Sequence, residues 1–431
     1  MTSTGADMRR IVGEVVAQHA PRYVGELEDL VALGRDGETA IQAHIRDRLR
    51  ALGAQVDVIA YDPRQLSMPY EFVAPDLVAP GPRASVVGVL RGAGTGRSLL
   101  LFAHPDLEPI GGPADGRHPP FRGVQSGGRI FGRGVADDLA GLSAMYCAVE
   151  TARAVAADLP GTVVLASAPS KGHARGVVPV LDCLPPLDAG LYLHPAESGE
   201  GLAQLKTATP GTLRFLVHLS GRPPDTLEPD HTPFAAESVN PIDLATTIAS
   251  AVRRLADRTE LAGVSAALTY LAAGTRERLH RVPAAAEAGM TVAFPPAVRL
   301  AAVHAAVEGA IRDRRLTHPW LAHHPPTLRW LSGTAGAAVD EADDIVRLTA
   351  TEIAEATGRA PTCYARHAAS DIRHPILRSG IPTVGLGPRA GSLGQAGGGD
   401  EWVDLGEYLQ TIAVTAAVIL RWCGTTAAAA G

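Results

Sequence analysis

The stretch SLLLFAHPDLEP, residues 98–109, decides the fold class of this 431-residue chain. Its first half, Ser98–Ala103, is a nearly continuous apolar run, which is typical of a strand buried on both faces of a parallel sheet. The run leads directly into a polar loop that contains His104 and Asp106. Because ligands of doubly wound sheets bind at the carboxyl ends of the strands, these two side chains lie where a functional site is expected.

Segments on either side of this stretch alternate between helix and strand patterns. Helices are predicted over 9–52, 138–157, 340–357 and 404–422, and strands over 84–90, 98–103, 162–167, 189–193 and 381–387. Such alternation is typical of an α/β domain with a doubly wound, mostly parallel sheet.

The pattern changes in the middle of the chain. Strands are predicted over 212–219, 264–271, 290–294 and 327–331, and helices over 241–257 and 297–313. This βαββαβ order is that of a small α+β domain. We therefore expect a discontinuous α/β domain, residues 1–209 and 334–431, interrupted by an inserted domain over 210–333.

Composition narrows the class of protein. The net charge of −6 and a pI near 6.2 argue against a nucleic-acid binder. The longest apolar run, Thr411–Leu420, is shorter than the about 20 residues that cross a bilayer, and the first residues carry no secretory signal. The four cysteines are scattered, which disfavours a disulfide framework or a thiolate zinc site. A cytoplasmic protein that binds neither nucleic acid nor membrane is expected.

Polar side chains that could form a site follow three of the predicted strands or lie in the loop GRGVADD. They are His104, Asp106, Asp137, Asp138, Ser170, Lys171, His173 and His194. Each one taken alone is more often a solvated loop residue, but histidine and aspartate side chains from separate strand ends can assemble a zinc site. In the His-x-Asp pattern, Asp106 can hydrogen-bond the far ring nitrogen of His104 and so fix the tautomer of a metal-bound imidazole.

Several segments together resemble the co-catalytic zinc hydrolases, the family that includes aminoacylase, acetylornithine deacetylase, succinyl-diaminopimelate desuccinylase and glutamate carboxypeptidase. The resemblance covers nearly the whole chain. It rests on SLLLFAHPDLEP, the Pro-Pro-Phe of 119–121, GGRIFGRGVADD, TVVLASAP, the inserted domain, SDIRHPILRSGIPTVGLGP and DEWVDL. It implies the fold described above and an active site with two zinc ions bridged by one aspartate.

The resemblance implies that only one of the two metal shells survives. The ligands of the first zinc fall on His104, on Asp137 as the bridging aspartate, and on His194, where the family has an acidic residue. The family's Glu-Glu pair, a general base followed by a ligand of the second zinc, falls on Ser170-Lys171. The last histidine of that second shell falls on Gly397. One zinc ion at most is therefore expected.

Lys171 is one of only two lysines among 39 basic residues. Near the position of the lost cation, its ammonium could neutralise Asp137 and donate to a substrate carbonyl. Alternatively it forms a simple ion pair with an orphaned carboxylate. Ser170 cannot act as a base by itself, and the sequence does not choose among His173, Asp138 and Glu108 as a replacement.

The inserted domain also departs from the family. The family's histidine there falls on Asp225, with His231 as a stand-in, and the usual asparagine and arginine are absent. Arg281 could hold a substrate carboxylate instead, and Arg373 is a further substrate-contact candidate. The resemblance implies a homodimer formed through this domain, which would serve as a lid and dimerisation domain.

Three hypotheses for the function follow. The first is an atypical enzyme that acts on the amide bond of a small peptide-like or N-acyl substrate with a single zinc ion, by hydrolysis or by acyl transfer and amide formation. The second is an inactive descendant that binds a small molecule or serves as a subunit. The third is a metal-free enzyme built on Lys171, His173 and His194.

Overall fold

The computed structural model describes residues 5–92, 94–108, 117–195, 198–224, 238–279, 281–368, 370–391 and 400–424. The chain divides into two compact units. The first comprises residues 1–67, 78–208 and 338–431, and the second comprises 68–77 and 209–337. Residues 68–77, which the sequence pattern places in the α/β domain, belong to the second unit because β2 (Glu71–Val73) pairs with a strand of its sheet.

The first unit is built on an eight-stranded mixed sheet with the order β1-β3-β7-β4-β8-β17-β9-β16. The bounds are β1 Gln55–Tyr61, β3 Arg83–Leu90, β4 Leu99–Ala103, β7 Val163–Ser167, β8 Ala189–Leu193, β9 Gln204–Lys206, β16 Thr362–Tyr364 and β17 Thr383–Leu386. The four central strands, β7, β4, β8 and β17, run parallel, whereas β1 and β3 are antiparallel additions at one edge.

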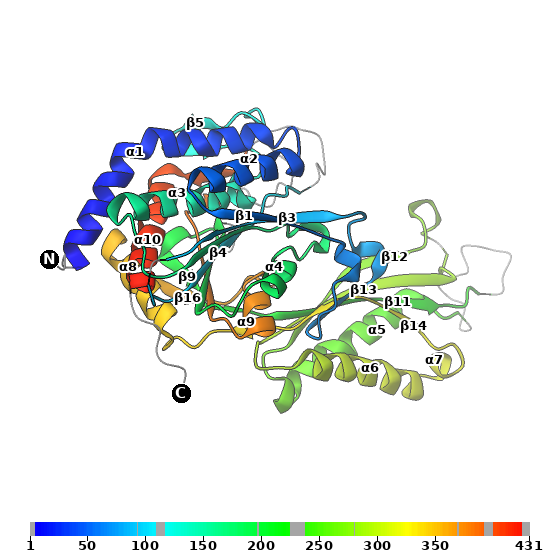
Figure 1. Ribbon diagram of the computed structural model, residues 1–431. Helices are drawn as coiled ribbons and strands as arrows, with labels where there is room; N and C mark the ends of the chain where they lie inside the picture. Colours follow the sequence, from blue (N-terminus) through cyan, green and yellow to red (C-terminus); the bar gives the residue numbers. More distant parts are fainter. Residues whose placement is uncertain are drawn as a thin grey trace. The chain divides into compact units, whose positions relative to one another are not determined.

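Helices cover both faces of this sheet, as the continuous apolar strands require. Their bounds are α1 Gly5–Leu33, α2 Glu38–Ala51, α3 Ala140–Val155, α4 Val177–Cys183, α8 Asp344–Thr357, α9 Arg373–Ser379 and α10 Leu405–Gly424. Leu99 and Leu101 of β4 face the core formed with α1, α3 and α10, and Leu100 and Phe102 face the core formed with α4. Figure 1 shows α1–α3 and α4 with α9 on opposite sides of the sheet. The predicted doubly wound α/β class is confirmed.

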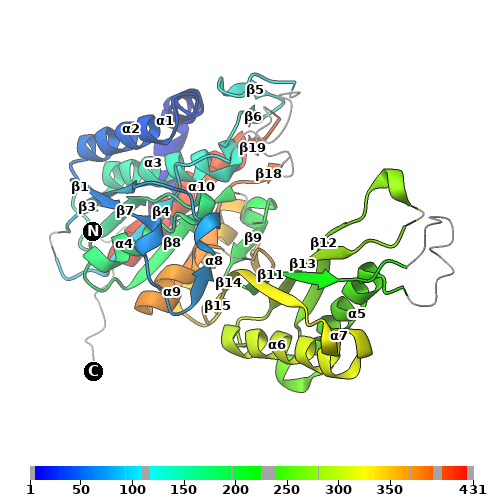
Figure 2. The ribbon, with the colours of Figure 1, turned by 90° about the vertical axis from the view of Figure 1, so that its right-hand side faces the viewer.

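The second unit is a five-stranded antiparallel sheet with the order β12-β13-β11-β14-β2. Its elements are β11 Gly211–Ser220, α5 Pro241–Arg253, β12 Ser265–Ala273, β13 Ala285–Phe294, α6 Leu300–Thr317, α7 Pro319–His323 and β14 Thr327–Thr334. Alternate residues of β11, such as Phe215 and Val217, are buried against α5 and α6. Figure 2 shows the helices on one face of this sheet.

A small four-stranded sheet, β18-β19-β6-β5, completes the first unit. Its strands are β5 Val124–Ser126, β6 Arg129–Phe131, β18 Ala390–Gly391 and β19 Trp402–Asp404. All four cysteines are unpaired. Among the described residues, no helix is long and apolar enough to span a membrane.

Candidate metal centre

Two imidazoles and one carboxylate converge at the carboxyl ends of the central strands. His104 follows β4, His194 follows β8, and Asp137 lies in the turn that precedes α3. The Nε2 atoms of His104 and His194 lie 2.9 and 3.1 Å from Asp137 Oδ1. The two Nε2 atoms lie 3.1 Å from each other. The structure therefore brings together all three side chains assigned to the surviving metal shell.

This donor set fits a zinc ion. Zinc binds imidazole nitrogen and carboxylate oxygen at about 2 Å in tetrahedral geometry, which places neighbouring ligand atoms about 3.3 Å apart. The three distances of 2.9–3.1 Å are close to that spacing. Both imidazoles are also buried, with His104 only 1% and His194 5% exposed. A cation at this point would take both ring nitrogens and the carboxylate oxygen as ligands, in place of the protons that otherwise lie between them.

Asp138 is a second carboxylate at the same centre. Its side chain and those of His104 and His194 offer ligand atoms that all lie within 4.8 Å of one another. Its Oδ2 accepts the backbone N–H of His104 at 3.1 Å, and its buried Oδ1 has no hydrogen-bond partner in the described part of the chain. Burial raises the pKa of Asp138 well above its usual value. From the sequence, Asp138 is predicted only as a candidate base.

Asp106 holds His104 and the loop after β7 in place. Its Oδ1 lies 3.2 Å from His104 Nδ1, and its carboxylate accepts the backbone N–H groups of Ser170 and Lys171 at 2.9 and 2.7 Å. Arg83 donates to it at 2.8 Å. Burial alone would raise the pKa of Asp106, but His104 and these donors lower it to about 2. Burial lowers the pKa of His104, and the two carboxylates beside it outweigh this and raise it to about 10.

Lys171 occupies the other side of the shared carboxylate. Its Nζ lies 2.6 Å from Asp137 Oδ2 and 3.4 Å from Glu108 Oε1. Burial opposes charge on both partners, but the two imidazoles hold the pKa of Asp137 well below its usual value, and Asp137 raises the pKa of Lys171. Asp137 thus directs one oxygen to the imidazoles and the other to an ammonium.

Glu401 fixes the turn that carries Asp137. Its Oε1 accepts the backbone N–H groups of Ala136 and Asp137 at 2.7 and 2.9 Å, and its Oε2 accepts that of Gly134 at 2.8 Å. Glu401 immediately precedes β19, and its burial raises its pKa to about 7. No sequence pattern singles out Glu401, because an acidic residue in DEWVDL gives no sign of this contact.

The remaining candidate residues are distributed more widely. Ser170 bonds through its backbone N–H to Asp106, and His173 is half-buried in the short turn Lys171–His173 with a positive φ of 58°. Arg373 is 5% exposed at the start of α9, and its guanidinium donates to the backbone oxygen of Ser370 and to the carboxylate of Asp371, just before the helix. Arg281 lies in the second unit. His231, Asp225 and Gly397 lie outside the described residues.

By its fold and its site, the protein is an α/β protein of two units with a candidate metal centre of histidine and aspartate side chains at the carboxyl ends of its central strands. Residues 100–421 match the sequence model of Peptidase family M20/M25/M40. The chain belongs to this family, which confirms the resemblance to zinc peptidases and deacylases.

Named relatives support the same placement. The chain is 25% identical over 369 residues to N-formyl-4-amino-5-aminomethyl-2-methylpyrimidine deformylase of Halalkalibacterium halodurans, covering 79% of this chain and 83% of that protein. It is 26% identical over 323 residues to succinyl-diaminopimelate desuccinylase of Halorhodospira halophila, covering 73% and 81%. Human carnosine dipeptidase 1 shares the fold, with a TM-score of 0.68 at 14% identity over 97% and 99% of the two chains. These relatives are hydrolases that act on amide bonds.

Proposed function

We propose that this protein acts on the amide bond of a small peptide-like or N-acyl substrate with one zinc ion, held by His104, Asp137 and His194. The observation that carries the proposal is the convergence of two imidazole Nε2 atoms on Asp137 Oδ1, at 2.9 and 3.1 Å. Two histidines and one carboxylate with an open position form a normal catalytic zinc shell. When bound there, zinc would supply a Lewis acid that polarises a carbonyl or acidifies water.

The protein's own residues prepare the site for this chemistry. Asp106 orients His104, and Glu401 holds the backbone on which Asp137 sits. The Lys171 ammonium, 2.6 Å from Asp137 Oδ2, stands in for a second cation. From there it donates a hydrogen bond to the oxygen of the substrate carbonyl as negative charge develops on it.

We further propose Glu108 as the replacement for the missing general base. Its carboxylate is 49% exposed and lies 3.4 Å from Lys171 Nζ, so it is open to water beside the site. Asp138 is fully buried and holds the backbone N–H of His104, which argues against a proton-transfer role. A base near the reacting carbonyl favours hydrolysis, and acyl transfer or amide formation remains the alternative direction.

Zinc stoichiometry tests the proposal. Elemental analysis of protein equilibrated with zinc and then dialysed should give roughly one zinc per chain, and His194→Ala should lose it. The matched control is His218→Ala, which removes a 47% exposed histidine of the second unit. No bound zinc in the wild-type protein, or full retention in His194→Ala, would refute the single-metal shell. Glu108→Gln should keep the zinc and lower any amide-bond activity.

A metal-free centre is the second candidate. The observation that favours it is the Lys171–Asp137 ion pair, which already neutralises the carboxylate without any metal ion. Such an enzyme, using Lys171, His173 and His194, predicts activity that survives chelation and fails in Lys171→Ala. A protein with neither zinc nor activity would instead be an inactive cleft that binds a small molecule or serves as a subunit.

We propose that the second unit mediates a homodimer through β12, the edge strand of its sheet. Within the described sheet β12 pairs on one side with β13, and Tyr270 and Leu271 on it are 49% and 40% exposed. An exposed edge strand with apolar side chains is a template for pairing with another chain. Light scattering should give twice the chain mass, and Tyr270→Glu with Leu271→Glu should give the monomer. A monomeric wild-type protein would refute the dimer.

A cytoplasmic location and substrate contacts by His231 and Arg373 stay predictions.

A further inference from the structure

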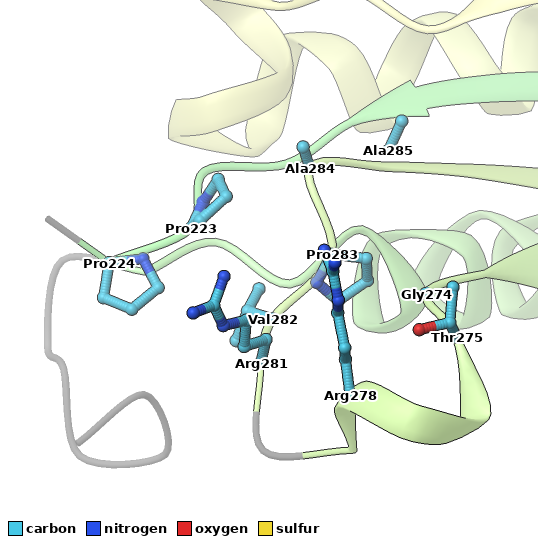
Figure 3. Close-up of a pocket in the computed structure, with 10 residues that line it drawn as sticks. All are labelled: Pro223, Pro224, Gly274, Thr275, Arg278, Arg281, Val282, Pro283, Ala284 and Ala285. Atoms are coloured by element: carbon cyan, nitrogen blue, oxygen red, sulfur yellow. The ribbon is translucent and has the colours of Figure 1, made fainter. Parts of the chain in front are cut away.

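A pocket of about 420 Å³ lies among three helices of the first unit. The residues that line it lie within 6–13 of α1, 352–356 of α8 and 410–417 of α10. A pocket of similar size, about 410 Å³, lies at the connection between β12 and β13 in the second unit (Figure 3), where most of the lining residues belong to loops. The helical pocket has firmer walls, because α10 packs against both α1 and α8. None of these lining residues belongs to the metal centre.

Small side chains keep the helical pocket open. Its apolar lining residues are alanine, glycine and valine, namely Ala6, Val12, Gly13, Ala356, Ala413, Val414 and Ala417. A Cβ atom added at Gly13 would meet nothing within 4 Å, so the space beside this part of α1 can accept further carbon atoms. The pocket therefore offers an apolar ligand room between the three helices.

Glu352 brings a buried carboxylate to the same pocket. The residue is 1% exposed, and its Oε1 accepts hydrogen bonds from Arg9 at 3.3 Å and from Arg421. Its Oε2 is also buried and has no hydrogen-bond partner in the part of the chain that the structure describes. A buried acceptor without a donor destabilises the folded state, and the penalty is larger when the acceptor is charged. A ligand that donates a hydrogen bond to Oε2 would remove this penalty.

The charged groups of the lining favour a neutral ligand. Arg9 and Arg10 line the pocket together with Glu352 and Glu355, so their positive and negative charges balance. Arg9 contacts both glutamates at 3.3 Å, and Arg10 pairs with Glu14 at 2.7 Å. A charged ligand would compete with these ion pairs, whereas a hydroxyl group adds a donor without breaking them.

We propose that this pocket binds a small, neutral, apolar molecule with one hydroxyl group, which donates a hydrogen bond to Glu352 Oε2. The volume of the pocket is that of a typical small-molecule site, and an apolar lining with few polar groups is typical of such sites. The proposal is independent of amide chemistry, because it concerns residues of α1, α8 and α10 alone.

Calorimetric titration of the full-length protein with 1-naphthol tests the proposal. The comparison probe is 1-methoxynaphthalene, which has the same rings but no hydrogen-bond donor. The naphthol should bind about tenfold more tightly, because the methyl ether cannot form the hydrogen bond to the charged acceptor. In Glu352→Gln this preference should shrink, because the acceptor has lost its charge. Equal binding of the two probes by the wild-type protein, or no binding of either, would overturn the proposal.

Further variants locate the binding. Gly13→Leu should weaken the binding of 1-naphthol by about tenfold or more, because the leucine side chain occupies the pocket. Gly25→Leu is the matched control, since Gly25 also lies inside α1 with open space around an added Cβ but does not line the pocket. Hydroxyl groups also bind zinc, so the titration is repeated with His194→Ala, which should leave the affinity unchanged. Full binding by Gly13→Leu, or loss of binding in His194→Ala, would refute this pocket as the site.

Discussion

Replacing Gly141 by alanine should damage both the stability of the first unit and the metal centre. Gly141 lies in the first turn of α3, directly beneath the end of β8. A Cβ atom at this position would lie 2.6 Å from the carbonyl carbon of Leu193 and closer still to its oxygen and to Asp138 Oδ1. Carbon atoms in good contact stand about 3.5–4.0 Å apart, so backbone must move by about 1 Å.

The expected magnitude follows from two opposing effects. Alanine is a better helix former than glycine by about 1 kcal/mol. Overpacking of a filled core costs about 1–3 kcal/mol, and here the obstacle is backbone of a central strand, which places the cost at the upper end. We expect Gly141→Ala to lower the free energy of unfolding by about 1–2 kcal/mol. Zinc affinity should fall as well, because a shift of Leu193 and Asp138 also displaces the adjacent ligands His194 and Asp137.

Urea unfolding monitored by circular dichroism measures the first effect, and zinc titration against a chelating dye measures the second. Gly25→Ala is the matched control, because Gly25 lies inside α1 and a Cβ there would meet nothing within 4 Å. The control should be stabilised by up to about 1 kcal/mol. If Gly141→Ala were as stable as Gly25→Ala and bound zinc as the wild type does, the close approach of α3 to β8 would be refuted.

Three further predictions concern charge. Glu26 is partly buried, which raises its pKa, but His44 and Arg48 of α2 outweigh this and lower it. The stabilising contribution of Glu26 is therefore present above the ordinary glutamate pKa and is lost as pH falls through the lowered pKa. Glu26→Gln should therefore cost about 1–3 kcal/mol at pH 7 and nothing in strong acid, as measured by unfolding at several pH values. Asp106→Asn should weaken zinc binding by about 10–100-fold in the dye titration, because the group that orients His104 loses its charge. Unchanged affinity would show that the Asp106 carboxylate does not orient His104 for zinc binding. Lys171→Met should tighten zinc binding in the same titration, because removing the ammonium frees Asp137 for the metal, whereas weaker binding would show that Lys171 supports the shell.

Sequence patterns predicted the buried centre of the fold and missed its edges. The strands Leu99–Ala103, Val163–Ser167 and Ala189–Leu193 are covered on both faces, and continuous apolar runs reveal such strands directly. The edge strand Gln55–Tyr61 is mostly exposed and carries no such run. The three residues of β2 lie in a proline-rich stretch, and their partner β14 is distant in sequence, so no local pattern indicates the pairing.

The position of a candidate site residue was predictable from the sequence where a single polar side chain directly follows the end of an apolar strand. His104 and His194 follow apolar strands immediately, and the structure places their ring nitrogens together. Between the adjacent Asp137 and Asp138, however, residue type alone cannot decide which carboxylate contacts the imidazoles, because backbone geometry within the turn sets their directions, and only the family resemblance assigns Asp137. Glu401 reaches this turn from the other end of the chain, through a contact that only the folded structure reveals.

The pairing of β2 with β14 has a consequence for synthesis of the chain. β2 ends at Val73 and β14 begins at Thr327, so about 250 residues are translated between the two partners. At about 5–20 residues per second, the ribosome takes roughly 10–50 s to cover that distance. During this interval β2 has no partner strand. The second sheet can be completed only when most of the polypeptide has left the ribosome. A fragment that starts at residue 209 would lack this strand and leave one edge of β14 uncovered.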